Sequence, residues 1–125
     1  MGFVYYNINP DGLREEDCVC RAITLACKLT LGLDYEDIQD KLYYTSQLLE
    51  CEELCVCCYK FLLDKVFEFP RIDCGGSTVG EFAEKNPKGI FIVRMVGHLS
   101  IIVDGDIHDI FNCSDGVITH CWQVE

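Results

Sequence analysis

The chain has 125 residues, of which 50% are hydrophobic and 25% charged, values typical of a single globular domain over residues 1–125 and atypical of a disordered chain. No apolar stretch approaches the roughly 20 residues of a membrane-spanning helix, and the N-terminal segment lacks the basic and apolar regions of a signal peptide. Ten basic and 21 acidic residues give a net charge of −11, which disfavours nucleic acids and anionic membranes as partners because both would repel the protein.

The N-terminal part is predicted to contain a short extended piece and a long helix. Residues 1–13 form the extended piece, which ends in the turn sequence NPDG at residues 9–12. The helix begins either at Asp11 or, with a fresh cap, at Asp17, and it ends near Leu31, before a glycine. Its apolar arc is wide, so we expect this helix to be central and packed on several sides.

Two more helices are expected before residue 70. Acidic residues at 34–37 open the second helix, whose apolar stripe contains Tyr35, Ile38 and Leu42. Ser46 is predicted to cap a third helix from about residue 47 to 66. The apolar residues of this third helix share one face: Leu48, Cys51, Leu54, Cys55, Cys58, Leu62 and Val66. The spacing predicts that its three cysteines, 51, 55 and 58, are buried together on the inner side.

The C-terminal part changes from a helical to a strand period. Thr78 and Glu81 have the spacing of a capping box, which starts a short helix that ends near residue 86. Four strands are expected after it, over residues 90–96, 98–103, 107–111 and 117–122. Asp104-Gly105 is a favoured pair for a two-residue hairpin loop. Helices first and strands last predict an α+β domain whose helices pack on a C-terminal antiparallel sheet.

Cys18 is the strongest candidate nucleophile among the ten cysteines. With a helix start at Asp17, Cys18 lies in the first turn, where the positive end of the helix dipole favours a thiolate. Cys18 lies on the packed arc of this helix, whereas Cys20 points elsewhere. The alternative is a cysteine with only a packing role, since free cysteine is among the most buried residue types.

A second group of polar residues lies on the predicted hairpin around Asp104-Gly105. With a two-residue loop, His98 faces Phe111, and Asp109 lies diagonal to His98 on the same face of the sheet. Asp109 would then accept the imidazole N–H and fix its tautomer. A three-residue loop would instead bring Asn112 opposite His98, so Asn112 is the alternative partner. The loop sequence favours Asp109.

Two motifs in this chain resemble the papain-like cysteine peptidase superfamily: Asp-Cys-x-x-Arg-Ala-Ile from residue 17, and Gly-His-Leu-x-x-x-x-Asp-Gly-x-x-x-Asp from residue 97. They are most similar to small proteins of phages and Gram-positive bacteria with an Asp-Cys-x-x-Arg-Ala signature, and NlpC-like amidases share the wider order. The resemblance covers residues 9–122. It implies a papain-like fold in which Cys18 is the nucleophile, His98 the base and Asp109 the orienting residue.

The same resemblance implies an oxyanion donor upstream of the nucleophile. Because no glutamine precedes Cys18, Asn9 is the candidate donor, with the backbone N–H of Cys18 as the other. The alternative for Asn9 is a turn residue without a catalytic role. We expect neither a metal nor another cofactor, because the cysteine cluster lacks the two Cys-x-x-Cys pairs of structural zinc sites. That cluster consists of Cys51, Cys55, Cys57 and Cys58.

These features predict a small cysteine hydrolase that acts through a thioester. The resemblance implies that it is a peptidase or isopeptidase/amidase with a peptide or protein substrate. Without a signal peptide, the ten cysteines are predicted to be mostly reduced, in the cytoplasm of a bacterium or of a phage-infected host cell. The alternative from another class is a catalytically silent papain-like binding protein of phage origin. Its negative charge would then engage a basic host protein.

Overall fold

One sheet of six strands organises the computed structural model, which describes residues 2–10 and 17–125. Neighbouring strands pair antiparallel except β1, which runs parallel to β5 at one edge. The C-terminal strands pair antiparallel as predicted, whereas the parallel edge strand that the N-terminal extended piece adds was not predicted. The spatial order is β1 (Gly2–Tyr5), β5 (Asp106–Asp109), β4 (His98–Val103), β3 (Ile90–Met95), β6 (His120–Gln123) and β2 (Arg71–Ile72).

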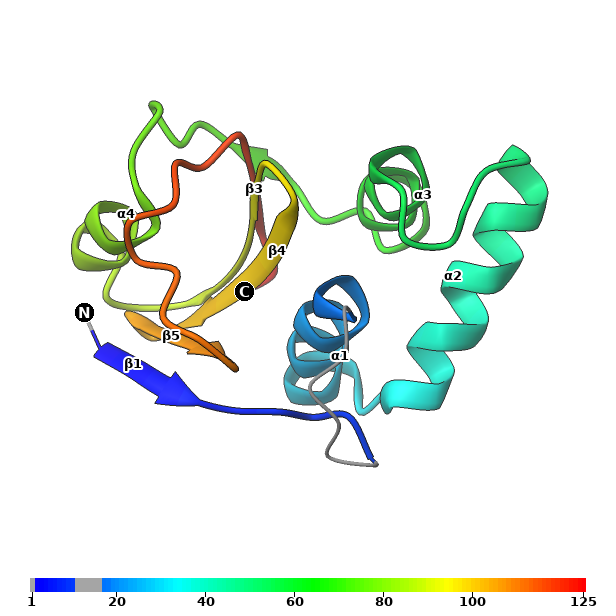
Figure 1. Cartoon of the computed structure of the whole chain (residues 1–125), viewed down its shortest axis with the longest axis horizontal. Helices are drawn as coiled ribbons and strands as arrows, with labels where there is room; N and C mark the ends of the chain where they lie inside the picture. Colours follow the sequence, from blue (N-terminus) through cyan, green and yellow to red (C-terminus); the bar gives the residue numbers. More distant parts are fainter. Residues whose placement is uncertain (1, 11–16) are drawn as a thin grey trace.

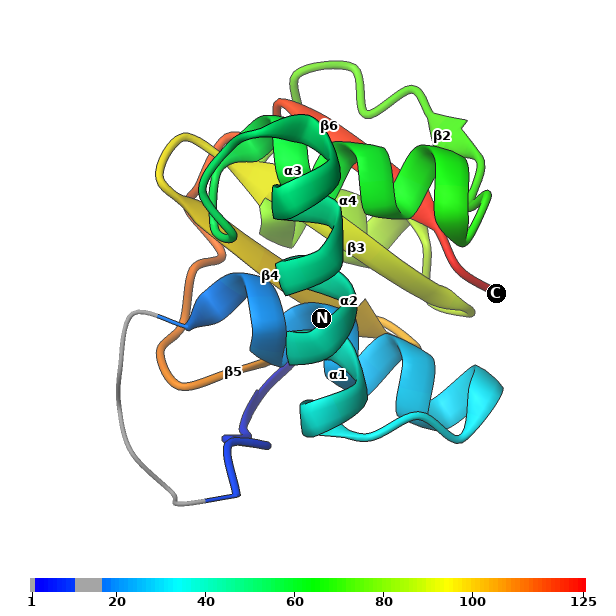
Figure 2. The same cartoon turned by 90° about the vertical axis from the view of Figure 1, so that its right-hand side faces the viewer.

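Helices cover both faces of this sheet (Figure 1). On one face lies α4 (Val79–Lys85), and on the other lie α1 (Cys18–Leu31) and α3 (Val56–Phe61). The remaining helix, α2 (Tyr35–Leu49), packs on the outer side of α1 and α3, and Figure 2 shows it crossing in front of them. Among the described residues, no helix combines the length and the apolar character that a membrane span requires. The predicted α+β class, with N-terminal helices packed on a sheet, is confirmed.

Strand alternation divides the core into two parts. Along β3, Ile90 and Ile92 belong to the core beneath α1, whereas Phe91 and Val93 belong to the core beneath α4. All residues of α1 from 19 to 27 are buried, as the wide apolar arc predicted. Because both faces of the sheet are covered, the central strand is apolar on both sides.

Reciprocal caps mark two helix starts as predicted. The Glu81 N–H donates to the Thr78 hydroxyl, and a Glu81 carboxylate oxygen accepts from the Thr78 N–H, so α4 begins directly after Thr78. Asp34 and Asp37 form the same pair at the start of α2. At α1, Asp17 is the N-cap residue. The alternative start at Asp11 lies outside the described residues.

The predicted third helix over residues 47–66 is wrong. Ser46 is buried inside α2 and donates its hydroxyl to the Tyr43 carbonyl, at 2.6 Å, instead of capping a new helix. The chain turns at Glu50, whose φ is 54°, and α3 follows after a loop. One π-helical turn, η1 (Leu62–Val66), extends α3.

The interrupted helix also removes the predicted stripe of buried cysteines. Cys58 is fully buried and donates its thiol to the Leu42 carbonyl, at 3.4 Å, but Cys51 and Cys55 are only half-buried. Leu48, expected on the same stripe, is 70% exposed. The common face required a continuous helix, and the turn between α2 and α3 breaks its period. All ten cysteines are free thiols.

The C-terminal strands differ from the predicted ones in their bounds. The strand predicted over residues 107–111 is β5, which ends earlier than predicted, at Asp109. The predicted strand over 117–122 begins later, with β6, because Val117 instead forms an isolated bridge with Thr78 at the start of α4. The two-residue strand β2 was not predicted, since so short a strand has no period to detect.

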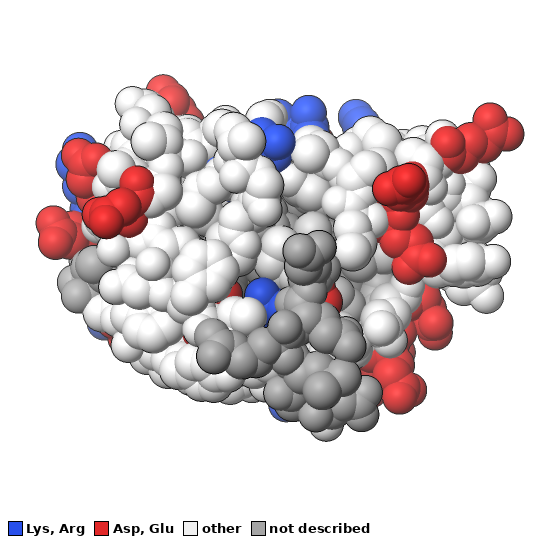
Figure 3. Space-filling model, viewed as in Figure 1, with Lys and Arg blue, Asp and Glu red and all other residues white. Residues whose placement is uncertain are grey.

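Acidic side chains are distributed unevenly over the surface. Figure 3 shows them gathered at the two ends of one face, over α4 and over α2. The middle of this face, between the helices α4 and α2, is mostly uncharged and carries a few basic groups. The net charge of −11 is therefore not shared by every part of the molecule.

Candidate active site

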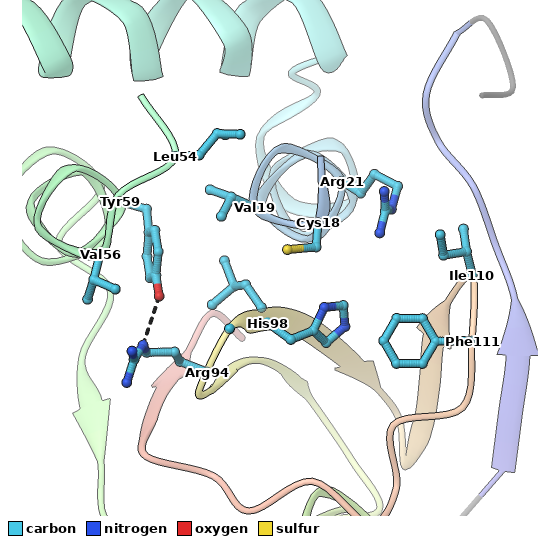
Figure 4. A pocket seen from close by; sticks show the side chains of 12 residues that line it. Cys18, Val19, Arg21, Leu54, Val56, Tyr59, Arg94, His98, Ile110 and Phe111 are labelled. Carbon is cyan, nitrogen blue, oxygen red and sulfur yellow. Dashed lines mark hydrogen bonds between the residues drawn. The ribbon is translucent and has the colours of Figure 1, made fainter. Parts of the chain in front are cut away.

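A cleft of about 640 Å³ lies where the first turn of α1 meets the start of β4. Cys18 and His98 both line it, and their side chains lie next to each other in Figure 4. The apolar lining comes from α1, β4, the segment after β5, the loop before α3 and the first residue of α3: Val19, Leu99, Ile110, Phe111, Leu54 and Val56. Tyr59, Arg21 and Arg94 supply the other polar groups.

Cys18 is the first residue of α1, as predicted for a thiol at a helix N-terminus. Its burial raises the pKa of the thiol, but hydrogen bonds from His98 and from the Leu99 N–H lower it. The positive charges of His98 and Arg21 act in the same direction. Together they hold the pKa of Cys18 below its ordinary value, which favours a thiolate.

His98 is the partner that keeps this thiolate paired. Burial lowers the pKa of His98, but Asp109, Cys113 and Cys18 outweigh burial and raise the pKa well above its ordinary value. Cys18 thus favours the deprotonated form while His98 favours the protonated form. The two directions agree, because both favour the thiolate–imidazolium form of the pair.

Asp109 orients the imidazole from the side opposite the sulfur. A carboxylate oxygen of Asp109, Oδ2, lies 2.7 Å from His98 Nε2 and also accepts the Ser100 hydroxyl at 2.7 Å. Burial raises the pKa of Asp109, but these bonds and the Ile110 N–H lower it, so Asp109 stays ionised. Because Nε2 is engaged with Asp109, Nδ1 is the ring nitrogen left for Cys18.

The length of the hairpin loop determines which residue lies next to His98. Val103 pairs with Asp106 across the hairpin, so Asp104 and Gly105 form the loop, with φ of 48° and 83°. Both positive values are those that a type I′ turn requires. The predicted register, and with it the approach of Asp109 to His98, is confirmed.

The alternative partner, Asn112, takes another place. Asn112 is exposed, and its side-chain oxygen accepts the Ser114 N–H at 3.0 Å in a turn after β5. The residue near the imidazole is Phe111, whose ring centroid lies 4.7 Å from that of His98, as the register predicted. The structure therefore brings together Cys18, His98 and Asp109, and leaves Asn112 outside.

A network of ion pairs links Asp109 to the start of α1. This network was not predicted from the sequence. Arg21 is buried, pairs with Asp17 one turn earlier and reaches within 3.8 Å of Asp109 Oδ1. Asp17 Oδ2 also accepts the Tyr35 hydroxyl at 2.7 Å. The i, i+4 spacing of an acid and an arginine was the available signal. The network fixes the helix turn that carries Cys18.

Asn9, expected as an oxyanion donor, belongs to the same network. It is buried, and its amide nitrogen donates to Asp17 Oδ2 at 3.0 Å and to the Tyr35 hydroxyl at 3.4 Å. Asn9 is not among the described residues that line the cleft. This position gives no support to an oxyanion role and instead makes Asn9 a support for the N-cap residue of α1.

One group of thiols outside the cleft could hold a metal ion. The sulfur atoms of Cys51, Cys55 and Cys57 lie within 4.8 Å of one another, and those of Cys55 and Cys57 are 2.8 Å apart. Soft thiolates suit zinc, but structural zinc sites have four ligands. Within the described residues this group offers three, because the nearby Cys58 thiol is engaged with the Leu42 carbonyl.

Comparison of the chain with protein-family models, curated proteins and solved structures found no match. A function is therefore inferred from the site alone. Three of its features are informative: a thiol at a helix N-terminus, an imidazole beside that thiol, and a buried carboxylate bonded to the imidazole. A cleft large enough for part of a peptide opens onto the thiol.

Proposed function

We propose that the protein is a cysteine hydrolase with a papain-like arrangement, which cleaves a peptide, isopeptide or related amide bond. The observation that supports this most strongly is the pairing of Cys18 with His98, while Asp109 engages the other ring nitrogen of His98 at 2.7 Å. A cysteine with only a packing role needs neither the imidazole nor the cleft. The order of the three residues, helix first and adjacent strands later, supports the papain-like arrangement.

In the first half of the proposed reaction, the Cys18 thiolate attacks the carbonyl carbon of the substrate amide. A carbon–sulfur bond forms, and the carbonyl electron pair moves to the oxygen. The tetrahedral intermediate then collapses as the carbon–nitrogen bond breaks. His98 gives its Nδ1 proton to the leaving nitrogen, which departs as an amine and leaves a thioester on Cys18.

In the second half, water hydrolyses the thioester. The oxygen of the water attacks the thioester carbonyl while neutral His98 takes a proton from that water. The carbon–sulfur bond then breaks. The products are a carboxylic acid and the regenerated Cys18 thiolate beside protonated His98. Asp109 keeps the imidazole in place throughout and stabilises its charged form.

The start of α1 offers one donor for the oxyanion of these intermediates. The backbone N–H of Cys18 belongs to the first turn of α1, whose N–H groups have no acceptor within the helix. A negative oxygen at this position also lies at the positive end of the helix dipole. Asn9 is not proposed as the second donor, because its amide nitrogen is engaged with Asp17 and Tyr35.

The test is labelling with a peptidyl chloromethyl ketone, followed by mapping of the modified cysteine by mass spectrometry. Wild-type protein should be labelled at Cys18, and the Cys18→Ala and His98→Ala variants should lose this labelling. Cys57→Ala is the matched control, because it removes an exposed thiol and should leave labelling of Cys18 unchanged. Labelling of Cys18 that is equal in wild-type and His98→Ala protein would contradict the proposal and favour the silent binding protein.

A further inference from the structure

Arg94 projects from β3 into the cleft, where two hydroxyl groups hold its guanidinium. Its Nε donates to the Tyr59 hydroxyl at 3.0 Å, and one terminal nitrogen, Nη1, donates to the Thr119 hydroxyl at 2.8 Å. Figure 4 shows Arg94 and Tyr59 on one side of the Cys18–His98 pair, opposite Phe111. The guanidinium is thus fixed at one end of the cleft, with Nη2 left as a donor.

No carboxylate of the described residues pairs with Arg94. This is unusual in a chain with 21 acidic and ten basic residues. The other arginine of the cleft, Arg21, is paired with Asp17 and Asp109, and the nearby Arg71 is paired with Asp64 at 2.7 Å. Buried charges are normally paired, whereas the partners of Arg94 among the described residues are neutral hydroxyls, which leaves its charge available to a ligand.

Further basic side chains lie near His120, which follows Thr119 in the chain. Burial and the charges of Lys60, Arg71 and Arg94 lower the pKa of His120, whereas the charge of Asp64, the partner of Arg71, raises it. In addition, no Asp or Glu is among the described residues that line the cleft. Among the described lining residues, the charged side chain at this end of the cleft is therefore Arg94, which a basic group of a partner would repel.

We propose that Arg94 binds a carboxylate of the substrate, which makes the substrates acidic peptides. This rests on the proposed hydrolase function and specifies its substrate class. The carboxylate is either an acidic side chain or a free C-terminus, since both present the same two oxygens to a guanidinium. A charge-assisted hydrogen bond in a partly desolvated cleft is strong enough to select such substrates.

The test compares three bromoacetyl peptides as alkylating reagents for Cys18. Bromoacetyl-Gly-Gln-amide is neutral, bromoacetyl-Gly-Glu-amide carries a side-chain carboxylate, and bromoacetyl-Gly-Gln carries a C-terminal carboxylate. Each reagent is also made with two glycines in place of one, so that two distances between the reactive carbon and the carboxylate are tested. The second-order rate constant for modification of Cys18 is measured by mass spectrometry in wild-type protein and in three variants: Arg94→Gln, Arg94→Lys and Lys28→Gln.

At least one acidic reagent should modify wild-type Cys18 about tenfold faster than its neutral counterpart. Arg94→Gln should remove this preference, and Arg94→Lys should retain part of it because the charge stays while the planar fork is lost. Lys28→Gln is the matched charge control, because Lys28 is exposed and about 15 Å along α1 from Cys18. It should leave the preference unchanged. Which acidic reagent reacts faster distinguishes a side chain from a C-terminus.

Equal rates for acidic and neutral reagents would overturn the assignment of Arg94. So would a preference that survives Arg94→Gln, or one that Lys28→Gln removes to the same degree. Every thiol reacts with these reagents at some rate, so the ratio is measurable even if Cys18 is not activated. A failure of this inference can therefore be told apart from a failure of the proposed function, which is judged by His98→Ala.

Discussion

The two walls of the cleft are built differently. One wall comes from α1, β4 and β5, where buried polar groups bond to one another from Asp17 through Arg21 and Asp109 to His98. The other wall comes from the loop before α3 and from α3 itself, which contribute Leu54, Val56 and Tyr59. The same loop and the start of α3 carry three thiols at least partly open to solvent: Cys51, Cys55 and Cys57.

The difference shows that exposure and activation of a thiol are separate properties. Cys57 is exposed, whereas Cys18 is partly buried and has a lowered pKa because His98 and the Leu99 N–H engage its sulfur. On the loop wall, burial raises the pKa of Cys55, but hydrogen bonds from Cys57, Cys51 and the Cys58 N–H hold it below its ordinary value. Reactivity in this molecule should therefore follow the hydrogen bonds at each sulfur and not its exposure. Substitutions and pH changes should therefore affect the bonded wall and the loop wall differently, and should affect buried and exposed positions of one wall differently.

The largest effect is expected at the centre of the bonded wall. Asp109→Ala leaves Arg21 and His98 without their shared carboxylate and should lower the free energy of unfolding by about 3–5 kcal/mol. Alkylation of Cys18 should slow as well. Urea denaturation and the iodoacetamide rate are the measurements. Asn112→Ala, at an exposed turn, should change stability by less than about 0.5 kcal/mol. The reverse pattern, with the large effect at Asn112→Ala and little effect at Asp109→Ala, would give the orienting role to Asn112.

The second effect concerns the helix behind the loop wall. Leu62→Ala removes a fully buried side chain and should cost about 2–5 kcal/mol of unfolding free energy. Leu48→Ala, at a position that is 70% exposed, should cost less than about 0.5 kcal/mol. Thermal or urea unfolding measures both. Similar losses would mean that the chain forms the continuous helix expected from its sequence, with both leucines on one buried stripe.

The third effect is a difference in pH dependence. An ordinary thiol with a pKa near 8.5 loses its thiolate, and with it roughly 75-fold in alkylation rate, between pH 8 and pH 6. The pKa of Cys18 is lowered and that of His98 raised, and both directions extend the ion pair to lower pH. The Cys18 rate should therefore fall less steeply over this range than the rate of an ordinary thiol.

The control for this pH profile is His98→Gln, which removes the positive partner of the thiolate. Cys18 in that variant should regain the steep profile of an ordinary thiol between pH 8 and pH 6. A steep profile already present in the wild-type protein would contradict the ion pair. Rates measured with iodoacetamide, which is uncharged, keep the charge of the reagent out of the comparison.

The smallest effect is expected for the hydroxyl that supports Asp109. Ser100→Ala removes one hydrogen bond to its carboxylate and should cost about 1 kcal/mol of unfolding free energy. The alkylation rate of Cys18 should fall only a few-fold, because His98 and the Ile110 N–H still hold Asp109. Ser100→Thr, which keeps the hydroxyl, should restore the rate. A loss as large as that of Asp109→Ala would show that Ser100 itself orients the imidazole.

Local chemistry explains why the bonded wall was predictable. Asp104-Gly105 fixes a two-residue loop, and the strand period then carries Asp109 to His98 without any knowledge of the rest of the fold. The position of Cys18 in the first turn followed from one of the two predicted helix starts, the one at Asp17. These predictions depend on a few neighbouring residues, which a sequence displays directly.

Tertiary burial explains why the rest was not predictable. Ser46 has the side chain of a helix cap, but packing keeps it inside α2, and no local signal separates these two roles. Asn9 was expected near the sulfur, whereas its bonds to Asp17 and Tyr35 depend on where α2 lies. Arg94 did leave a signal: it is the charged residue of the otherwise apolar segment Ile90–Met95.

The central claim is that the bonded wall activates Cys18, and competition among the thiols tests it most directly. Native protein is treated with a limiting amount of iodoacetamide at pH 7, and the modification of each of the ten cysteines is followed by mass spectrometry. Cys18 should be modified first, ahead of the exposed Cys57, and His98→Ala should reverse this order. If Cys57 is modified first in the wild-type protein and Cys18 reacts no faster than the other partly buried thiols, the claim is contradicted.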